Sequence, residues 1–309
     1  MINGVINIYK EAGFTSHDVV AKLRGILKQK KIGHTGTLDP DATGVLPVCL
    51  GKATKLCDVI GNWDKAYRAT LLLGRQTDTE DISGRILAEN PVNVREEEIA
   101  ALISSFVGPY DQIPPMYSAK KVAGKKLYEL AREGKVIERK PCPVRIQSIK
   151  ILKVALPYVE FEVSCSKGTY IRSLCRDIGQ KAGCGGCMSA LERLRVSDFL
   201  LQDALTLSQV EELRNQGVLM DHLRSIDSVF PFYPQMVADQ NIDRLLKNGN
   251  PFSIDDGRIL ASSDSSIVSI PEGLSFLYRV YDYERHFIGL YQKDESKGLM
   301  KPEKLFFDL

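Results

Sequence analysis

The chain has 309 residues and a net charge of +2, and 44% of its residues are hydrophobic while 26% are charged. This length exceeds that of one small core and suits two domains of an ordinary globular protein. No apolar run approaches the roughly 20 residues that a membrane-spanning helix requires, so a membrane protein is excluded.

The N-terminal part of the chain predicts a strand, a helix, a loop and a second strand. Its first residues contain neither a basic leader nor a small-residue cleavage site, so we expect a cytoplasmic protein without an export signal. Residues 4–9 predict a strand, and Ser16 is placed to cap a helix. Residues 33–44 are too rich in Gly, Pro and Thr for regular structure, whereas residues 66–73 predict a buried strand. The apolar residues that define one face of the helix are Val19, Val20, Leu23, Ile26 and Leu27.

Residues 110–145 predict a basic insertion that stands off the main sheet. They include two prolines and an amphipathic helical piece around residues 127–131, and residues 111–145 contain nine Lys and Arg against four Asp and Glu. Residues 226–309 have a net charge of −4, so the preceding residues have +6. A basic body suits a polyanionic partner, because phosphate contacts release counterions. A lysine-rich surface that only faces water has the same composition, so charge alone leaves both interpretations open.

The segments after the insertion predict more regular structure and then a second domain. Residues 159–166 alternate apolar and polar side chains as a half-buried strand does, and a helix is expected from about Thr169. Residues 230–234 have the composition of a linker. A short helix and β-like runs near residues 259, 266, 276 and 287 follow it. We therefore expect a small, mainly β domain at the C-terminus.

The seven cysteines are odd in number and scattered, which suits a reducing cytosol better than a disulfide framework. Cys184 and Cys187 have the spacing of half a zinc site. No second Cys pair or His pair completes it, so we expect thiols in a turn and no metal. Asp78 and Asp81 lie in an acidic stretch like a calcium loop, but the spacing of the ligands is broken there, and we exclude that site too.

The loop at residues 33–44 can hold a carboxylate at a fixed place beside a ligand. Gly33, Gly36 and Gly44 permit backbone angles that other residues avoid, and Pro40 favours an extended Asp39. An aspartate that merely caps a backbone amide fits the same loop, and loop chemistry alone favours that simpler interpretation.

Longer motifs identify a family. Residues 33–55, GHTGTLDPDATGVLPVCLGKATK, resemble the signature of the TruB family of tRNA pseudouridine synthases. The resemblance covers most of residues 1–225 and returns more weakly at residues 245–252, where family members begin a PUA-like barrel. The chain departs from the family at Glu11, where a proline is usual, and at Val196 and Ser197, where an arginine and a threonine are usual. Supporting segments in the family's order are residues 65–84, 114–134, 167–179 and 188–199.

The resemblance implies both a fold and a reaction. The expected fold is α+β: a pseudouridine synthase catalytic domain at residues 1–225, with a mixed, largely antiparallel sheet and an RNA-gripping insertion at residues 110–145. A PUA-like RNA-binding β domain is expected at residues 226–309. The implied reaction is isomerisation of uridine 55 in the T arm of tRNA, without cofactor, metal or guide RNA. A monomer is expected.

The resemblance also assigns the catalytic residues. Asp39 is the essential carboxylate, and Arg172 pairs with it, which would hold the carboxylate anionic and fix its rotamer. Tyr67 stacks on the uracil and helps to remove the C5 proton. Attack at the sugar, addition to the base and proton removal from C2′ stay open as roles for Asp39.

Further residues are implied to bind the RNA. Tyr170 and Leu191 match walls of the pocket, and His34 matches the residue that fills the space left by the flipped uridine. A histidine satisfied by backbone contacts fits position 34 equally well. The candidate phosphate contacts in the insertion are Lys120, Lys121, Lys125 and Lys126.

Two other functions stay open. One is the related guide-RNA-dependent subunit that modifies ribosomal RNA, against which the short C-terminal domain and the absence of basic tails argue. The other is an RNA-binding protein or chaperone that has lost catalysis, against which Asp39, Tyr67 and Arg172 argue. Activity on a bare tRNA transcript would separate these from the first interpretation.

Overall fold

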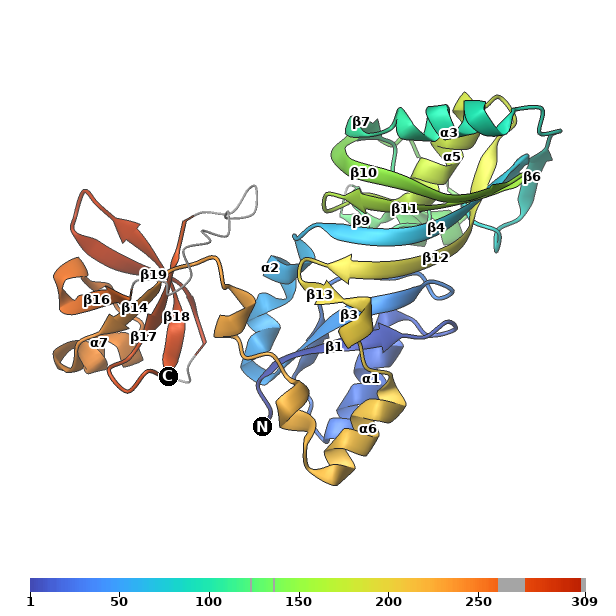
Figure 1. Cartoon of the computed structure of the whole chain (residues 1–309). Helices are drawn as coiled ribbons and strands as arrows, with labels where there is room; N and C mark the ends of the chain where they lie inside the picture. Colours follow the sequence, from blue (N-terminus) through green and yellow to red (C-terminus); the bar gives the residue numbers. More distant parts are fainter. Residues whose placement is uncertain (123, 136, 261–275, 307–309) are drawn as a thin grey trace.

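The structure is a computed structural model that describes residues 1–122, 124–135, 137–260 and 276–306. It contains two large sheets, of nine and six strands, with helices packed against them (Figure 1). The predicted α+β class is confirmed. Within the described ranges, no helix has the length and apolarity needed to cross a membrane.

The nine-stranded sheet holds most of the first two thirds of the chain. Its spatial order is β1-β3-β12-β4-β11-β10-β7, with β2 added to β3 and β13 to β12. Only the contact between β3 and β12 is parallel, so the predicted mixed, largely antiparallel sheet is confirmed. The strands are β1 (Gly4–Lys10), β2 (Ile32–His34), β3 (Thr43–Leu50), β4 (Lys65–Leu73), β7 (Gly108–Gln112), β10 (Cys142–Ala155), β11 (Tyr158–Cys165), β12 (Gly186–Val196) and β13 (Phe199–Leu200).

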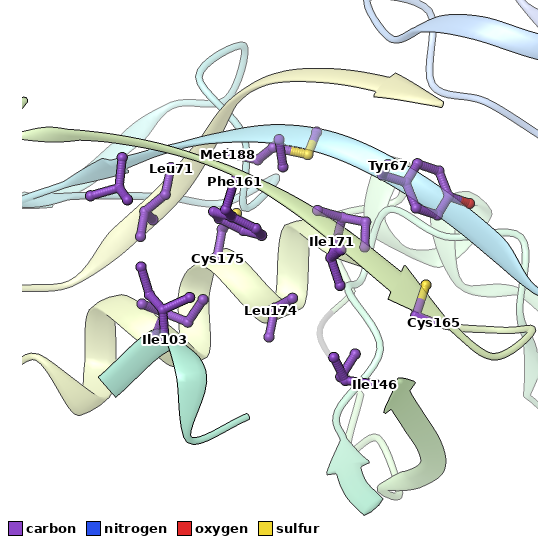
Figure 2. Close-up of a cluster of buried hydrophobic side chains, with 14 of the residues drawn as sticks. Tyr67, Leu71, Ile103, Ile146, Phe161, Cys165, Ile171, Leu174, Cys175 and Met188 are labelled. Atoms are coloured by element: carbon purple, nitrogen blue, oxygen red, sulfur yellow. The ribbon is translucent and has the colours of Figure 1, made fainter. Parts of the chain in front are cut away.

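Helices bury the two ends of this sheet in separate cores. At one end, α3 and α5 pack on β4, β10 and β11, and Figure 2 shows Tyr67 at the edge of that cluster, with its hydroxyl directed away from the aliphatic side chains. At the other end, α1 and α6 pack on β1 and β3 (Figure 1). The helices of this part are α1 (Ser16–Leu27), α2 (Cys57–Gly61), α3 (Glu96–Ser104), α4 (Leu127–Arg132), α5 (Ile171–Lys181) and α6 (Leu207–Gln216), with the 3-10 helix η1 (Gly51–Leu56) before α2.

Helix α1 is capped by Thr15, not by Ser16 as predicted. Thr15 accepts a hydrogen bond from the amide of Asp18, whose carboxylate accepts the amide of Thr15 in return. Ser16 is buried, and its hydroxyl accepts the backbone N–H of Leu38 at 3.0 Å. Ser16 therefore holds the loop beside Asp39 in place of capping the helix.

The predicted loop at residues 33–44 is shorter than its composition indicated. Gly33 and His34 pair with β3 as the end of β2, and Gly44 lies inside β3. Gly44 has a φ of 102°, and a Cβ there would lie 2.3 Å from the carbonyl oxygen of Arg193. The glycine thus permits a close approach of β3 to β12, which composition alone cannot distinguish from a turn.

The insertion is also narrower than residues 110–145. Both ends of that segment belong to the main sheet, because β7 pairs with β10 at its edge. The part that stands off comprises a hairpin of β8 (Lys121–Val122) and β9 (Lys125–Lys126), followed by α4. A second hairpin, β5 (Arg75–Thr77) with β6 (Ile86–Glu89), leaves the sheet after β4.

The predicted C-terminal β unit is present as the six-stranded sheet. Its order is β15-β19-β18-β17-β14-β16, and the predicted short helix is α7 (Asp243–Lys247). The β-like run near residue 266 lies outside the described residues. The strands are β14 (Gln235–Ala238), β15 (Phe252–Ser253), β16 (Gly257–Leu260), β17 (Tyr278–Tyr281), β18 (Phe287–Asp294) and β19 (Leu299–Leu305).

The predicted linker at residues 230–234 is a buried aromatic cluster. Phe230 and Tyr233 are almost fully buried, and Trp63 meets Phe230 edge to face at 6.3 Å. The same core includes side chains of β1 and β3 from the first sheet and of β18 from the second. The prolines in this segment suggested an exposed linker, whereas its aromatic side chains bury the contact between the two sheets.

Candidate active site

The predicted catalytic residues meet in a hollow of about 670 Å³. It lies between the loop after β2, strands β4 and β12, the start of α5 and the inserted segment. Its volume is within the usual range of ligand pockets. Residues that line it include Asp39, Tyr67, Asp81, Tyr117, Tyr128, Arg132, Tyr170, Arg172, Leu191 and Arg193.

Asp39 lies on a loop whose backbone is anchored from the N-terminal segment. The buried Lys10 ammonium donates hydrogen bonds to the carbonyls of Pro40 at 2.9 Å and Phe14 at 2.5 Å. The carbonyl of Pro40 also accepts the N–H of Gly13 at 3.0 Å. Together with the bond from Leu38 to Ser16, these contacts fix the residues on both sides of Asp39.

Arg172 grips the Asp39 carboxylate with two nitrogen atoms. Its Nε lies 3.0 Å from Oδ2 and its Nη2 lies 3.2 Å from Oδ1, which is the parallel geometry of a bidentate pair. The carbonyls of Thr79 and Tyr117 accept hydrogen bonds from Nη1 and Nη2 at 3.1 and 2.8 Å. A second anion, Asp81, lies 3.7 Å from Nη1. The arginine side chain is only 8% exposed, so its orientation is strongly constrained.

The electrostatics of this pair set the protonation of Asp39. Burial raises the pKa of Asp39 above its ordinary value, and the positive charge of Arg172 opposes that shift. The negative charge of Asp81 adds to the rise, and Lys10 adds to the opposition. Arg172 therefore favours the ionised carboxylate against the effect of burial, and the raised pKa makes Asp39 a stronger base than a solvated aspartate.

Tyr67 lies in β4 opposite Arg193 of β12. Burial raises the pKa of Tyr67 to about 12, while the charge of Arg193 and a hydrogen bond to it act in the opposite direction. The phenol is therefore neutral at physiological pH. Arg193 is 1% exposed and donates from Nε to the carbonyl of Val45 at 2.6 Å.

Tyr170 and Leu191, the two predicted walls of the pocket, both line the hollow. Leu191 lies on β12 opposite Ala69 of β4. Tyr170 immediately precedes α5, and its backbone exchanges two hydrogen bonds with the side-chain amide of Gln112, at 2.7 and 2.9 Å. These bonds fix the backbone one residue before the α5 helix that carries Arg172.

Three charged groups of the pocket lie within the family-like segments at residues 65–84 and 188–199, but the sequence did not single them out as site residues. Asp81 was considered only as a calcium ligand, yet it faces Arg172. Arg193 is a charge in a buried strand, and a single charge in a strand equally marks an exposed edge. Lys65 is 8% exposed and donates to the carbonyls of Gly61 and Trp63, and burial lowers its pKa to about 8. Arg193 and Lys65 could have been recognised in the sequence as charged side chains at core positions of apolar runs.

The remaining predicted binding residues lie outside this hollow. The inserted segment does border the hollow, but through Tyr117, Tyr128 and Arg132. His34 is in edge-to-face contact with His17 at 5.0 Å, and its Nδ1 is buried without a hydrogen-bond partner of good geometry among the described residues. The predicted lysines that do not line the hollow are Lys120, Lys121, Lys125 and Lys126.

Among the described residues, one group of side chains has the spacing of metal ligands. Asp282, Glu284 and His286 lie in the turn between β17 and β18, with Nδ1 of His286 3.1 Å from Oδ2 of Asp282. That contact suffices to explain the arrangement as an ion pair beside a turn. Cys184 and Cys187 are buried thiols at the start of β12.

Comparison with known proteins identifies the chain's family. Residues 24–171 match the N-terminal domain model of the TruB family pseudouridylate synthases, and residues 172–230 match the tRNA pseudouridylate synthase B C-terminal domain. The chain is 51% identical to tRNA pseudouridine synthase B of Lachnoclostridium phytofermentans, over 99% of this chain and 100% of that one. The chain belongs to the TruB family of pseudouridylate synthases. It is therefore an enzyme, as the resemblance implied.

Other TruB relatives and solved structures agree with this placement. The chain is 45% identical to tRNA pseudouridine synthase B of Clostridium novyi, over 98% of this chain and 99% of that one. Its fold is similar to a chain in a Cbf5-Nop10-Gar1 complex, with a TM-score of 0.73, 24% identity, and coverage of 98% and 85%. It is also similar to a chain of an H/ACA RNP bound to a substrate RNA, with a TM-score of 0.71, 24% identity, and coverage of 99% and 85%. At this identity the structural likeness shows the fold alone.

Proposed function

We propose that this enzyme isomerises uridine 55 in the T arm of tRNA to pseudouridine. The observation that carries the proposal is the bidentate pair of Asp39 and Arg172 at the bottom of a hollow of about 670 Å³, in a member of the TruB family. The curated relatives are named tRNA pseudouridine synthase B, which supports tRNA as the substrate. The choice of uridine 55 rests on the family resemblance.

Asp39 starts the reaction as an ion. The target uridine is flipped out of the folded RNA loop and enters the hollow with its glycosidic bond near the carboxylate. The N1–C1′ bond breaks, the uracil turns, and C5 joins C1′, so no atom is gained or lost. Arg172 keeps the carboxylate ionised and aims both of its oxygens, which lowers the cost of orienting it at the moment of reaction.

Tyr67 and Leu191 hold the uracil while it turns. Both line the hollow, Tyr67 from β4 and Leu191 from the neighbouring β12. We assign stacking on the uracil to the Tyr67 ring. Since the phenol is neutral, it acts as a relay: its oxygen accepts the C5 proton while its own O–H proton passes to solvent. Arg193 stabilises the oxygen during that transfer.

We assign different roles to the two domains. We assign catalysis to residues 1–225 and RNA binding by a PUA-like unit to residues 226–309, in a monomer that acts without guide RNA. The inserted segment within residues 110–145 closes over the RNA loop, since Tyr117, Tyr128 and Arg132 already border the hollow. His34 fills the space that the flipped uridine leaves.

An unmodified tRNA transcript tests the proposal. Incubation with the wild-type protein alone, without guide RNA, should produce pseudouridine at position 55 and at no other uridine. Asp39→Asn should produce none while still binding the transcript. Conversion at another position would overturn the choice of uridine 55, and conversion only with added guide RNA would favour the ribosomal-RNA-modifying alternative.

A further inference from the structure

A second hollow, of about 510 Å³, shares no lining residue with the active site. It is formed by α1, the turn after α1, β2 and the start of α2. The family motifs quoted for the reaction do not explain it. Residues that line it are His17, Val20, Arg24, Lys30, Lys31, Ile32, Gly33, His34, Thr54 and Cys57.

The second hollow is cationic and contains no carboxylate. Arg24, Lys30 and Lys31 contribute three positive charges, and no Asp or Glu is among the lining residues. Within the described ranges, no carboxylate lies at ion-pair distance from any of these three side chains. Like charges gathered around a concave surface concentrate a positive potential there and attract an anion.

The cationic hollow is also held in shape. Arg24 donates from Nε to the carbonyl of Lys30 at 3.0 Å and from Nη2 to the carbonyl of Ile32 at 3.3 Å. These bonds tie the last turn of α1 to the turn that carries the two lysines. The backbone that presents Lys30 and Lys31 is therefore positioned before any ligand arrives, which lowers the entropic cost of binding.

The lysines of the inserted segment differ in this respect. Lys125 lies 4.0 Å from the carboxylate of Glu133, and Lys126 lies over the ring of Tyr128 at 5.4 Å. Lys120 is in contact with the thiol of Cys142. Lys120, Lys125 and Lys126 thus each contact another side chain of the protein, and that of Lys125 is a carboxylate. Within the described ranges, Arg24, Lys30 and Lys31 have no anionic partner.

The proximity of the cationic hollow to the active site indicates which anion it binds. His34 lines it, and Gly36, two residues further along the same loop, lines the active site. Two residues of chain span at most about 7 Å. The two hollows therefore lie close together at residues 34–36, and the backbone beside a uridine in the active site is within reach of the cationic hollow.

We propose that the hollow formed by His17, Arg24, Lys30, Lys31 and His34 binds a backbone phosphate of the RNA strand directly beside the target uridine. This proposal rests on the proposed function, because it takes the flipped uridine as the occupant of the active site. The phosphate supplies the charge that the hollow lacks, and it holds the strand while the base is outside the stack. The edge-to-face pair of His17 and His34 forms one wall of the site.

Salt dependence of tRNA binding tests the proposal. Affinities for an unmodified tRNA transcript are measured over a series of salt concentrations in the Asp39→Asn protein, which keeps the RNA unchanged during the measurement. Lys30→Gln and Lys31→Gln should each weaken binding about tenfold. Each should reduce the slope of log affinity against log salt, and the double variant should reduce it by about 0.7–0.9, as expected for one lost phosphate contact. Lys22→Gln is the matched control, because Lys22 lies on the exposed face of α1 outside the hollow.

The location of the phosphate is tested by ethylation interference on the same transcript. Ethylation of a phosphate adjacent to uridine 55 should weaken binding to the parent protein and should not weaken it further in the Lys30→Gln, Lys31→Gln double variant. Identical interference patterns for both proteins would overturn the proposal. So would an unchanged salt slope in both single variants, or a slope for Lys22→Gln that falls by the same amount. Loss of inorganic phosphate binding without any change in tRNA binding would also overturn it, because the hollow would then be a site for the free ion.

These outcomes are separable from a failure of the proposed function. Pseudouridine mapping with the wild-type enzyme reports the reaction, whereas the salt slope reports contacts to phosphates. If uridine 55 is converted and the slopes are unchanged, the phosphate site fails and the function stands. If no uridine is converted, the function fails whatever the slopes show.

Discussion

The active site and the cationic hollow differ in how their charges are balanced. In the active site, Arg172 faces Asp39 and Asp81, so the charges compensate one another within the protein. In the cationic hollow, Arg24, Lys30 and Lys31 have no acidic counterpart among the lining residues. A site whose charges are already paired is arranged for chemistry on a neutral group, since the uracil brings no charge. A site with unpaired charges is arranged for a ligand that supplies the counter-charge.

This difference predicts which kinetic quantity each region controls. Substitutions in the active site should act on the rate of the chemical step, because its contacts are made to the reacting nucleotide. Substitutions in the cationic hollow should act on tRNA affinity and on its dependence on salt. An active-site substitution that changes only tRNA affinity, or a substitution in the cationic hollow that changes only the chemical step, would contradict this distinction.

The largest effect is expected for Asp39→Asn. The substitution keeps the shape of the side chain but removes the charge, so turnover should fall on the order of 10³-fold or more. Affinity for the transcript should change less than about threefold, since Arg24, Lys30 and Lys31 are untouched. Single-turnover conversion and filter binding on the same preparation measure the two quantities. Substantial turnover by this variant would remove Asp39 from the reaction.

Tyr67→Phe should have the next largest effect. The ring is kept, so stacking on the uracil should survive, but the hydroxyl that relays the C5 proton is lost. We expect the single-turnover rate to fall about 10²-fold, within the usual range for a proton-transfer group. Tritium release from C5-labelled RNA follows the proton directly. A rate within a few-fold of the wild type would limit Tyr67 to stacking.

Arg172→Lys should weaken the reaction about tenfold and also change its pH dependence. A lysine provides a point charge in place of the planar fork, so the bidentate geometry is lost. Arg172 lowers the pKa of Asp39 against the effect of burial, so a weaker partner lets that pKa rise. Because the ionised carboxylate is required, activity should then be lost at a higher pH as the solution is acidified. A pH–rate profile with an unmoved acid limb would contradict this account of the pair.

The smallest effect is expected from the inserted segment. Neutralising Lys125 and Lys126 together should weaken tRNA binding only about threefold, because both already have partners within the chain. Their combined change in salt slope should be less than half of that for Lys30 and Lys31. Parallel binding measurements at several salt concentrations make the comparison. Equal slopes for the two pairs would remove the distinction between the insertion and the hollow.

The family resemblance predicted that Asp39 pairs with Arg172, but not which charged groups surround the pair. Asp39 and Arg172 are 133 residues apart, and only the family resemblance connected them before the structure placed them 3.0 Å apart. Arg193 and Lys65 were missed because their burial depends on strand pairing between β4 and β12, which no local pattern encodes. Asp81 was missed because a carboxylate is informative only once its partner is known.

The fold was predicted best where local patterns suffice. The helix at residues 16–27 and the strand at residues 66–73 follow from the spacing of their apolar side chains, although the capping residue and the exact ends differ. Errors occurred where tertiary contact overrides composition. Gly44 is inside a strand because β12 lies against it, and Phe230 is buried because Trp63 and the second sheet cover it.

The place of β12 in the sheet has a consequence for how the enzyme is made. This strand lies between β3 and β4, and within the nine-stranded sheet it joins β1–β3 to β4, β11, β10 and β7. A nascent chain that ends before Gly186 already contains Asp39, Tyr67 and Arg172, but on two half-sheets with facing open edges. The late strand must enter between them, which is a contact between residues distant in sequence and therefore slow to form. During synthesis on the ribosome, these exposed edges are where a premature chain would mispair with its neighbours.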